Sequence, residues 1–358
     1  MKETKDIISP KPERPPALDR IVSTKLTEEE KRDLVVYFKE VFDKQELEEL
    51  KSGKIEFSEE QISLIKLSND LISQELAGYG INAMDVPAAN VHILDAQQYK
   101  QFGERHYLFL GNSDAVTSPY DQAVVLRNRE RSKYNFLTVV THEMLHLKSF
   151  VSMNPVGVKR EEAERLGVRE VSETKGEDED FIITARRQGW NVEEVKRDGE
   201  CYFHNIDEAL TEHLTLKIIR ENGTHIFGDE FAVSESLRQA LCRYIDVILT
   251  NKFLSQVGRS YFEEQQAWLE DDVLLLPEAQ KIWRDYQNAD EKRKGAVLLD
   301  ALEHYTDKGL DKVEQFHYFE ERRFFRKLIK ELYEKIGAIL NRKMEFWHYL
   351  LKGVLVVI

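Results

Sequence analysis

Cysteine is scarce in this chain, which has 358 residues but only Cys201 and Cys242. Two thiols are too few for the disulfide framework that stabilises many small secreted proteins. Residues 1–16 also lack the apolar stretch that a secretion signal needs. We therefore expect a cytoplasmic protein with reduced cysteines.

Long apolar runs and net positive charge are lacking as well. No run of about 18 apolar residues occurs, so no membrane span is expected. The net charge of −14 argues against nucleic-acid binding, which needs concentrated positive potential. One basic stretch, 321–330, interleaves its charges with apolar residues at helical spacing, and we interpret it as a solvated helix face.

The composition, with 42% hydrophobic and 32% charged residues, is that of a globular protein with a substantial core. The patterns along the chain predict a mostly helical α+β fold. Residues 1–25 hold four of the eight prolines and predict an extended, disordered arm. We expect one domain at 26–222 and a helical C-terminal region at 223–358 that packs on it.

Helical periodicity and short apolar runs alternate in the first domain. A polar excursion at 154–180 is expected to be partly helical or mobile, and 181–190 and 199–205 are expected to pair as a hairpin. Strands are predicted at 90–95, 106–112 and 121–128. Helices are predicted at 27–44, 58–80, 134–150 and 205–222, and from about 233 onwards.

Two histidines stand four residues apart in the run NFLTVVTHEMLHLKSF, residues 135–150. Because a helix turns about 100° per residue, His142 and His146 project from one face, and both imidazoles can reach one Zn²⁺. Glu143 lies beside them, where its carboxylate can take a proton from a metal-bound water without binding the metal. This HExxH spacing is typical of zinc hydrolases.

The alternative is an ordinary core helix with two hydrogen-bonded histidines. With ten histidines in the chain, chance predicts only ~0.03 matches to HExxH. The neighbours Val139, Val140 and Leu145 are apolar, so the helix is expected to be buried. Burying two imidazoles and a carboxylate there without partners would cost several kcal/mol. The run therefore favours a metal site.

A catalytic zinc site usually has a third protein ligand and an open position for water. The metzincin pattern fails to supply that ligand, since it needs glycine at position 149 and histidine at 152, where the chain has Ser149 and Ser152. Glu162 and Glu164 are alternatives, but their segment is highly charged and lacks an apolar face.

A better source of the third ligand is the predicted helix that contains NIDEALTEHLT. Glu208 and Glu212 are four residues apart and share a face of this helix. One can bind the metal while the other accepts the N–H of a ligating histidine. The spacing leaves open whether Glu208 or Glu212 is the ligand.

The segments VVTHEMLH and IDEALTE together resemble the gluzincin clan of zinc metallopeptidases, which includes the thermolysin-like enzymes. The resemblance implies zinc on His142, His146 and Glu208, with Glu143 as general base. It places Glu212 where thermolysin-like enzymes have an aspartate that supports a ligand. It also implies that 26–222 is a zincin-like catalytic domain with a small mixed or antiparallel sheet, flanked by extra helices.

Three features depart from the gluzincin pattern. Asp207 stands where asparagine is common, and Lys148 stands where an apolar residue is usual. Residues 147–207, between the second histidine and Glu208, make a longer gap than in thermolysin-like proteins. An inserted segment accounts for this gap, since the entropic cost of loop closure rises slowly with length.

Peptide hydrolysis would also need an oxyanion donor and a strand edge that holds the extended substrate. Tyr202, His204 and His225 lie near the ligand helix in sequence and are candidate donors, although each is also explained as a structural or surface residue. Residues 121–128 run almost directly into the metal helix and are our candidate edge strand. An internal strand fits them equally well.

The sequence thus predicts a cytoplasmic zinc-dependent peptidase that acts on a peptide or protein, with no nucleic-acid or membrane partner. A zinc hydrolase of non-peptide substrates is one alternative. A non-catalytic binding or regulatory module with a structural zinc site is another.

Overall fold

The structure, a computed structural model, describes part of the chain from residue 27 to residue 312. The predicted arm at 1–25, the predicted strand at 106–112 and the basic stretch at 321–330 lie outside the described residues, as do Glu162 and Glu164. The described residues are 27–29, 31–33, 36, 55–79, 81, 85–105, 113–118, 123–129, 131–149, 151–158, 170–172, 180–188, 191–194, 201–202, 204–271 and 279–312.

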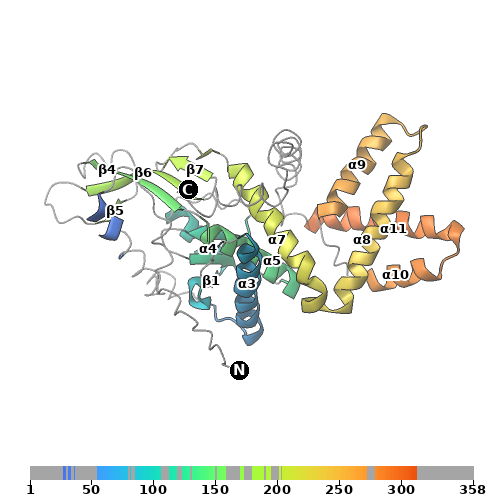
Figure 1. Cartoon of the computed structure of the whole chain (residues 1–358). Coiled ribbons are helices and arrows are strands. Elements are labelled where there is room, and N and C mark those ends of the chain that lie inside the picture. Colours follow the sequence, from blue (N-terminus) through green and yellow to red (C-terminus); the bar gives the residue numbers. More distant parts are fainter. Residues whose placement is uncertain are drawn as a thin grey trace, which may run out of the picture.

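A small mixed sheet of three strands lies in a mostly helical structure, which is therefore of the α+β class (Figure 1). β1 (Val91–Leu94) pairs parallel with β3 (Ala123–Arg127), and β3 pairs antiparallel with β2 (Ala115–Ser118). The strand order β1-β3-β2 puts β3 in the centre. The strands predicted at 90–95 and 121–128 are confirmed, but 121–128 is internal, so its assignment as the edge strand was wrong.

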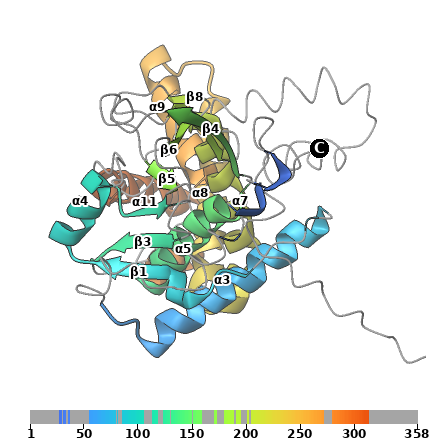
Figure 2. The same ribbon diagram turned by 90° about the vertical axis from the view of Figure 1, so that its left-hand side faces the viewer.

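Both faces of this sheet are covered, which explains why its central strand is a continuous apolar run. Val125 of β3 packs with Tyr99 and Phe102 of α4 (Ala96–Arg105). Val124, on the opposite face, belongs to a larger core that includes residues of α3 and α5. Figure 2 shows α4 on one side of β1 and β3, and α3 with α5 on the other. The sheet therefore holds α5 against a rigid surface.

Three helices pack together beside the sheet: α3 (Glu59–Gly78), α5 (Lys133–Leu147) and α7 (His204–Phe227). α3 begins where the sequence predicts, because the Ser58 hydroxyl accepts the backbone N–H of Gln61 while the Gln61 side chain accepts that of Ser58. α7 is longer than the predicted helix at 205–222. The expected domain boundary between residues 222 and 223 therefore lies inside this helix.

Between α5 and α7 the described residues form a second sheet. The described parts of 154–180 are strands, and the expected hairpin of 181–190 with 199–205 is wrong, because β7 lies between β6 and β8. β6 pairs antiparallel with β4, β5 and β7. The strands are β4 (Val151–Val158), β5 (Glu170–Ser172), β6 (Asp180–Gln188), β7 (Asn191–Glu194) and β8 (Cys201–Tyr202).

The described C-terminal residues form four helices with an apolar cluster of their own, as the helical pattern after residue 233 predicts. Gly228 joins α7 to α8 with a φ of 69°, a left-handed conformation that glycine adopts without steric cost. No helix among the described residues has the length and apolar character that a bilayer span requires. The four helices are α8 (Asp229–Leu249), α9 (Gln256–Asp271), α10 (Ala279–Asn288) and α11 (Glu291–Lys312).

Candidate metal centre

Apolar packing brings two predicted ligand helices, α5 and α7, face to face. Val140 and Met144 of α5 and Leu210 of α7 are almost fully buried in one core. On the α3 side, the hydroxyls of Ser68 and Thr141 form a buried hydrogen bond of 3.0 Å next to the first histidine of the motif. These contacts hold α5 between α3 and α7, so the ligand-bearing face of α5 is directed at α7.

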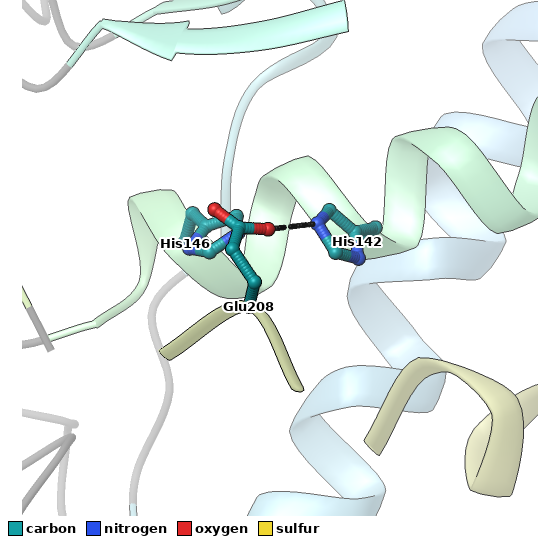
Figure 3. Close-up of side chains that lie close together, drawn as sticks. All are labelled: His142, His146 and Glu208. Carbon is teal, nitrogen blue, oxygen red and sulfur yellow. Dashed lines mark hydrogen bonds and ion pairs between the residues drawn. The ribbon is translucent and has the colours of Figure 1, made fainter. Parts of the chain in front are cut away.

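The side chains of His142, His146 and Glu208 converge between the two helices (Figure 3). Nε2 of His142 lies 3.1 Å from Nε2 of His146, and each lies 3.2 Å from Oε2 of Glu208. Three ligands at ~2.0–2.1 Å from a tetrahedral zinc ion would be separated by roughly 3.3 Å. The three donor atoms thus have nearly the spacing of one face of a zinc coordination tetrahedron.

Hydrogen bonds alone do not account for this triangle. Each imidazole Nε2 carries at most one hydrogen, and the Glu208 carboxylate only accepts, so the three short contacts share at most two protons. If both histidines donate to Glu208, two N–H groups face each other across 3.1 Å. A cation among the three atoms would instead use a lone pair of each. The arrangement therefore favours a metal ion over a proton network.

Asp207 orients one of these histidines. Its Oδ2 atom lies 3.2 Å from Nδ1 of His146, and its side chain is 4% exposed. An acceptor at Nδ1 favours the tautomer that carries the proton there, which leaves the Nε2 lone pair directed at the metal position. Sequence reasoning missed this role, although the signal was present: Asp207 directly precedes the ligand Glu208.

Electrostatics couple the ligands strongly. Burial favours neutral His146, but the carboxylates of Glu208 and Asp207 outweigh it and hold the pKa of His146 well above its usual value. Burial also favours protonated Glu208, but His146 and His142 outweigh it and keep the pKa of Glu208 well below its usual range. A cation that binds Nε2 of His146 must therefore displace a proton.

Glu143 lies on the side of α5 that faces β2. The hydroxyl of Thr117, on β2, is 2.8 Å from Oε2 of Glu143 and 2.8 Å from its main-chain oxygen. The predicted general base is therefore supported by the strand that stands at the end of the described β1-β3-β2 order. This contact could not be predicted, because β2 is only four residues long and was not expected as a strand.

The three candidate oxyanion donors differ in where the structure places them. His204, at the start of α7, has Nδ1 3.6 Å from Oε1 of Glu208, and its side chain is 44% exposed. His225 is 17 residues beyond Glu208 on the same helix, which at 1.5 Å per residue puts it about 25 Å away and excludes it. The backbone of Tyr202 is in β8, directly before α7, and its side chain lies outside the described residues.

Two further charged side chains are buried close to the ligands in sequence. Glu212, one turn after Glu208 on α7, has no exposed surface, and Lys148, at the end of α5, is 1% exposed. The histidine partner that the structure identifies is Asp207, and the expected role of Glu212 as such a partner stays a prediction. Lys148, a departure from the gluzincin pattern, is accommodated inside the protein.

Among the described residues, His142, His146 and Glu208 form the group of His, Cys, Asp or Glu side chains that is close enough to bind one metal ion. No protein-family model, curated protein or solved structure matches this chain. The function is therefore inferred from the chemistry of the site.

Proposed function

We propose that the protein is a zinc-dependent peptidase with a zincin-like core, in which His142, His146 and Glu208 bind the metal. The observation that carries the proposal is the triangle of donor atoms with edges of 3.1, 3.2 and 3.2 Å. Two imidazoles and one carboxylate are a common ligand set of catalytic zinc. Asp207, against His146, adds the supporting acceptor that such ligands usually have.

Three protein ligands leave one position of a tetrahedral ion for water or substrate, as catalytic sites do and structural sites do not. His204, whose Nδ1 lies 3.6 Å from Oε1 of Glu208, is outside the ligand group that the described residues form. This supports hydrolysis over a purely structural zinc site. Bound zinc would supply Lewis acidity, which polarises the scissile carbonyl and makes water acidic enough to react near neutral pH.

Glu143 is suited to move the proton in this reaction. It follows His142 directly on α5, as the HExxH spacing requires of a base that acts on a metal-bound water, and its Oε2 is held by Thr117. Glu143 takes the proton from the attacking water and returns it to the leaving amine. His204 is the remaining described candidate for an oxyanion donor, because it stands beside Glu208 and is partly exposed.

A peptide substrate would lie along β2. This strand is at the end of the order β1-β3-β2 and touches the general base, so it replaces 121–128 as the candidate edge. An extended peptide that pairs with such an edge is held by main-chain hydrogen bonds, independent of its side chains. Because β2 contacts Glu143 and can pair with an extended main chain, its place favours a peptide over a compact non-peptide substrate.

Two measurements on the purified protein test the proposal. Elemental analysis is expected to find one zinc per chain, and His142→Ala is expected to lose it. Incubation with a peptide library, followed by mass spectrometry, is expected to detect cleavage by the parent and none by Glu143→Gln, which keeps its zinc. Glu230→Gln, an exposed residue of α8, is the matched control. Equal cleavage by Glu143→Gln would sink the peptidase assignment, and zinc without cleavage would favour the binding module.

A further inference from the structure

The contact between Thr117 and Glu143 involves both the side chain and the main chain of the general base. The Thr117 hydroxyl lies 2.8 Å from Oε2 and 2.8 Å from the carbonyl oxygen of Glu143. It joins residues that are 26 positions apart, on β2 and α5. A single side chain therefore links β2 to the helix that carries both histidine ligands.

The register of β2 explains why Thr117 points at α5. Ala115, two residues earlier on the same face, is buried in the core that includes α5. Val116, on the opposite face, packs against the cluster that includes α4. Because side chains alternate along a strand, Thr117 must share the face of Ala115. Its side chain is held there, with only 9% of the residue exposed.

The hydroxyl of Thr117 has one hydrogen to share between two acceptors, the carboxylate and the main-chain oxygen of Glu143. Donation to Oε2 restricts the rotamer of Glu143, and donation to the main-chain oxygen ties the same residue to β2. Oε1 of Glu143 makes no hydrogen bond with a described residue, so it is the oxygen that remains to take a proton. The two carboxylate oxygens of Glu143 therefore differ, because Oε2 accepts the hydrogen bond of Thr117 and Oε1 is left to accept a proton.

We propose that Thr117 is a positioning residue, which holds the Glu143 carboxylate so that Oε1 faces the attacking water. This inference rests on the proposed peptidase function. In this arrangement β2 has two roles, because the strand that would bind the substrate also holds the Glu143 carboxylate. Fixing both on one strand keeps base, water and carbonyl in register, and small displacements in such an arrangement reduce rates strongly.

Thr117→Val tests the inference, because it removes the hydroxyl and keeps the shape of the side chain. Loss of a hydrogen bond to a charged group is expected to lower kcat roughly tenfold to a hundredfold, with KM and zinc content unchanged. Thr117→Ser restores the hydroxyl and is expected to return kcat to within about threefold of the parent. Thr215→Val is the matched control, since its hydroxyl bonds only the carbonyl of Thr211 among the described residues.

Crystal structures of zinc-loaded protein give a readout that needs no substrate. Glu143 is expected to leave its parent rotamer in Thr117→Val and to keep it in Thr117→Ser. An unmoved Glu143 in Thr117→Val, or an unchanged kcat, would overturn the inference. So would a loss of activity that serine fails to restore, because it would indicate strand packing instead. Failure of the peptidase function is seen separately, as an active Glu143→Gln or a parent without zinc.

Discussion

Two hydrophobic clusters of the described chain differ in what their helices bury. The cluster formed by α8 to α11 is apolar, and the buried polar side chains described in these helices, Ser234 and Gln265, are uncharged. The cluster formed by the three-stranded sheet with α3, α5 and α7 contains five buried ionisable side chains in its two ligand helices and the residue after α5. These are His146, Lys148, Asp207, Glu208 and Glu212.

This difference distinguishes the apolar core of the C-terminal helices from the region that contains the candidate metal centre. Burying a charge is unfavourable by several kcal/mol unless it is paired or binds a metal. The C-terminal cluster avoids that cost entirely in its described part. The region formed by the three-stranded sheet, α3, α5 and α7 buries its ionisable side chains in a small volume. The side chains of His142, His146 and Glu208 converge there. Such a concentration indicates a functional site, since apolar residues would make a more stable core.

The largest contrast is expected from removal of one carboxylate in each region. Glu208→Ala deletes a proposed ligand and is expected to weaken zinc binding more than about a hundredfold. The stabilisation by zinc is lost with it, roughly 4 kcal/mol when free zinc is a thousand times Kd. Glu235→Ala, which breaks the ion pair with Arg238 in α8, should keep full zinc content. Zinc analysis measures the zinc content of the two variants, and thermal unfolding measures their stability. Equal zinc content in Glu208→Ala and Glu235→Ala would contradict the assignment of Glu208 as a ligand.

A smaller effect is expected from the residue that orients His146. Asp207→Ala removes the acceptor at Nδ1, and loss of such a partner typically lowers metal affinity about 10–100-fold. Asp207→Asn keeps an acceptor without its charge, so it should fall between the parent and Asp207→Ala. Competition with a chelator measures the affinities, with the exposed Asp229→Asn as control. Parent affinity in Asp207→Ala would show that His146 needs no orienting partner.

The junction of the two regions is sensitive to volume. A Cβ at Gly223 of α7 would lie 2.2 Å from the buried ring of Phe231 on α8. Gly223→Ala gains about 1 kcal/mol of helix propensity but overpacks the junction by about 1–3 kcal/mol, so we expect net destabilisation by about 1 kcal/mol. Urea unfolding measures this, and adding Phe231→Leu should relieve it. A more stable Gly223→Ala would show that the ring moves aside freely.

The smallest effect concerns the tie between α3 and α7, where Lys217 Nζ donates to Glu75 Oε1 at 2.5 Å and to the Tyr79 hydroxyl at 3.2 Å. Burial favours the neutral amine, but these hydrogen bonds outweigh it and raise the pKa of Lys217 above 10.5. The stabilisation is therefore present below pH 10.5 and lost as pH rises through the raised pKa.

Lys217→Met should cost about 1 kcal/mol or less at pH 7, because the side chain is partly exposed. The exposed Lys252→Met is the control. Unfolding experiments at pH 7 and above pH 11 compare them, and a deficit that persists unchanged at high pH would rule out the ion pair as its cause.

Local periodicity explains what the sequence could predict. His142 and His146 share a helical face by spacing alone, and Glu208 lies on a second predicted helix, among apolar residues such as Ala209 and Leu210 that pack it against its neighbour. Both helices are observed, because their apolar residues pack against each other whatever the length of the intervening chain. The capped start of α3 at Ser58 was equally local, since it depends on residues three positions apart.

The missed features depend on contacts between distant segments. β2 escaped prediction because four residues flanked by Ser113, Asp114 and a proline carry too little periodicity. Without β2, neither the Thr117 contact nor the described strand order β1-β3-β2 was accessible. The predicted segments 181–190 and 199–205 do contain strands, β6 and β8, although their direct pairing was wrong. β4 and β5 escaped prediction because residues 154–180 are highly polar, and polarity was interpreted as a surface excursion.

The most direct test of the metal centre is a crystal structure with an anomalous difference map measured at the zinc absorption edge. We predict one peak ~2.0–2.1 Å from Nε2 of His142, Nε2 of His146 and an oxygen of Glu208. A zinc-loaded crystal without a peak at this position, or with its zinc bound by other residues, would contradict the account.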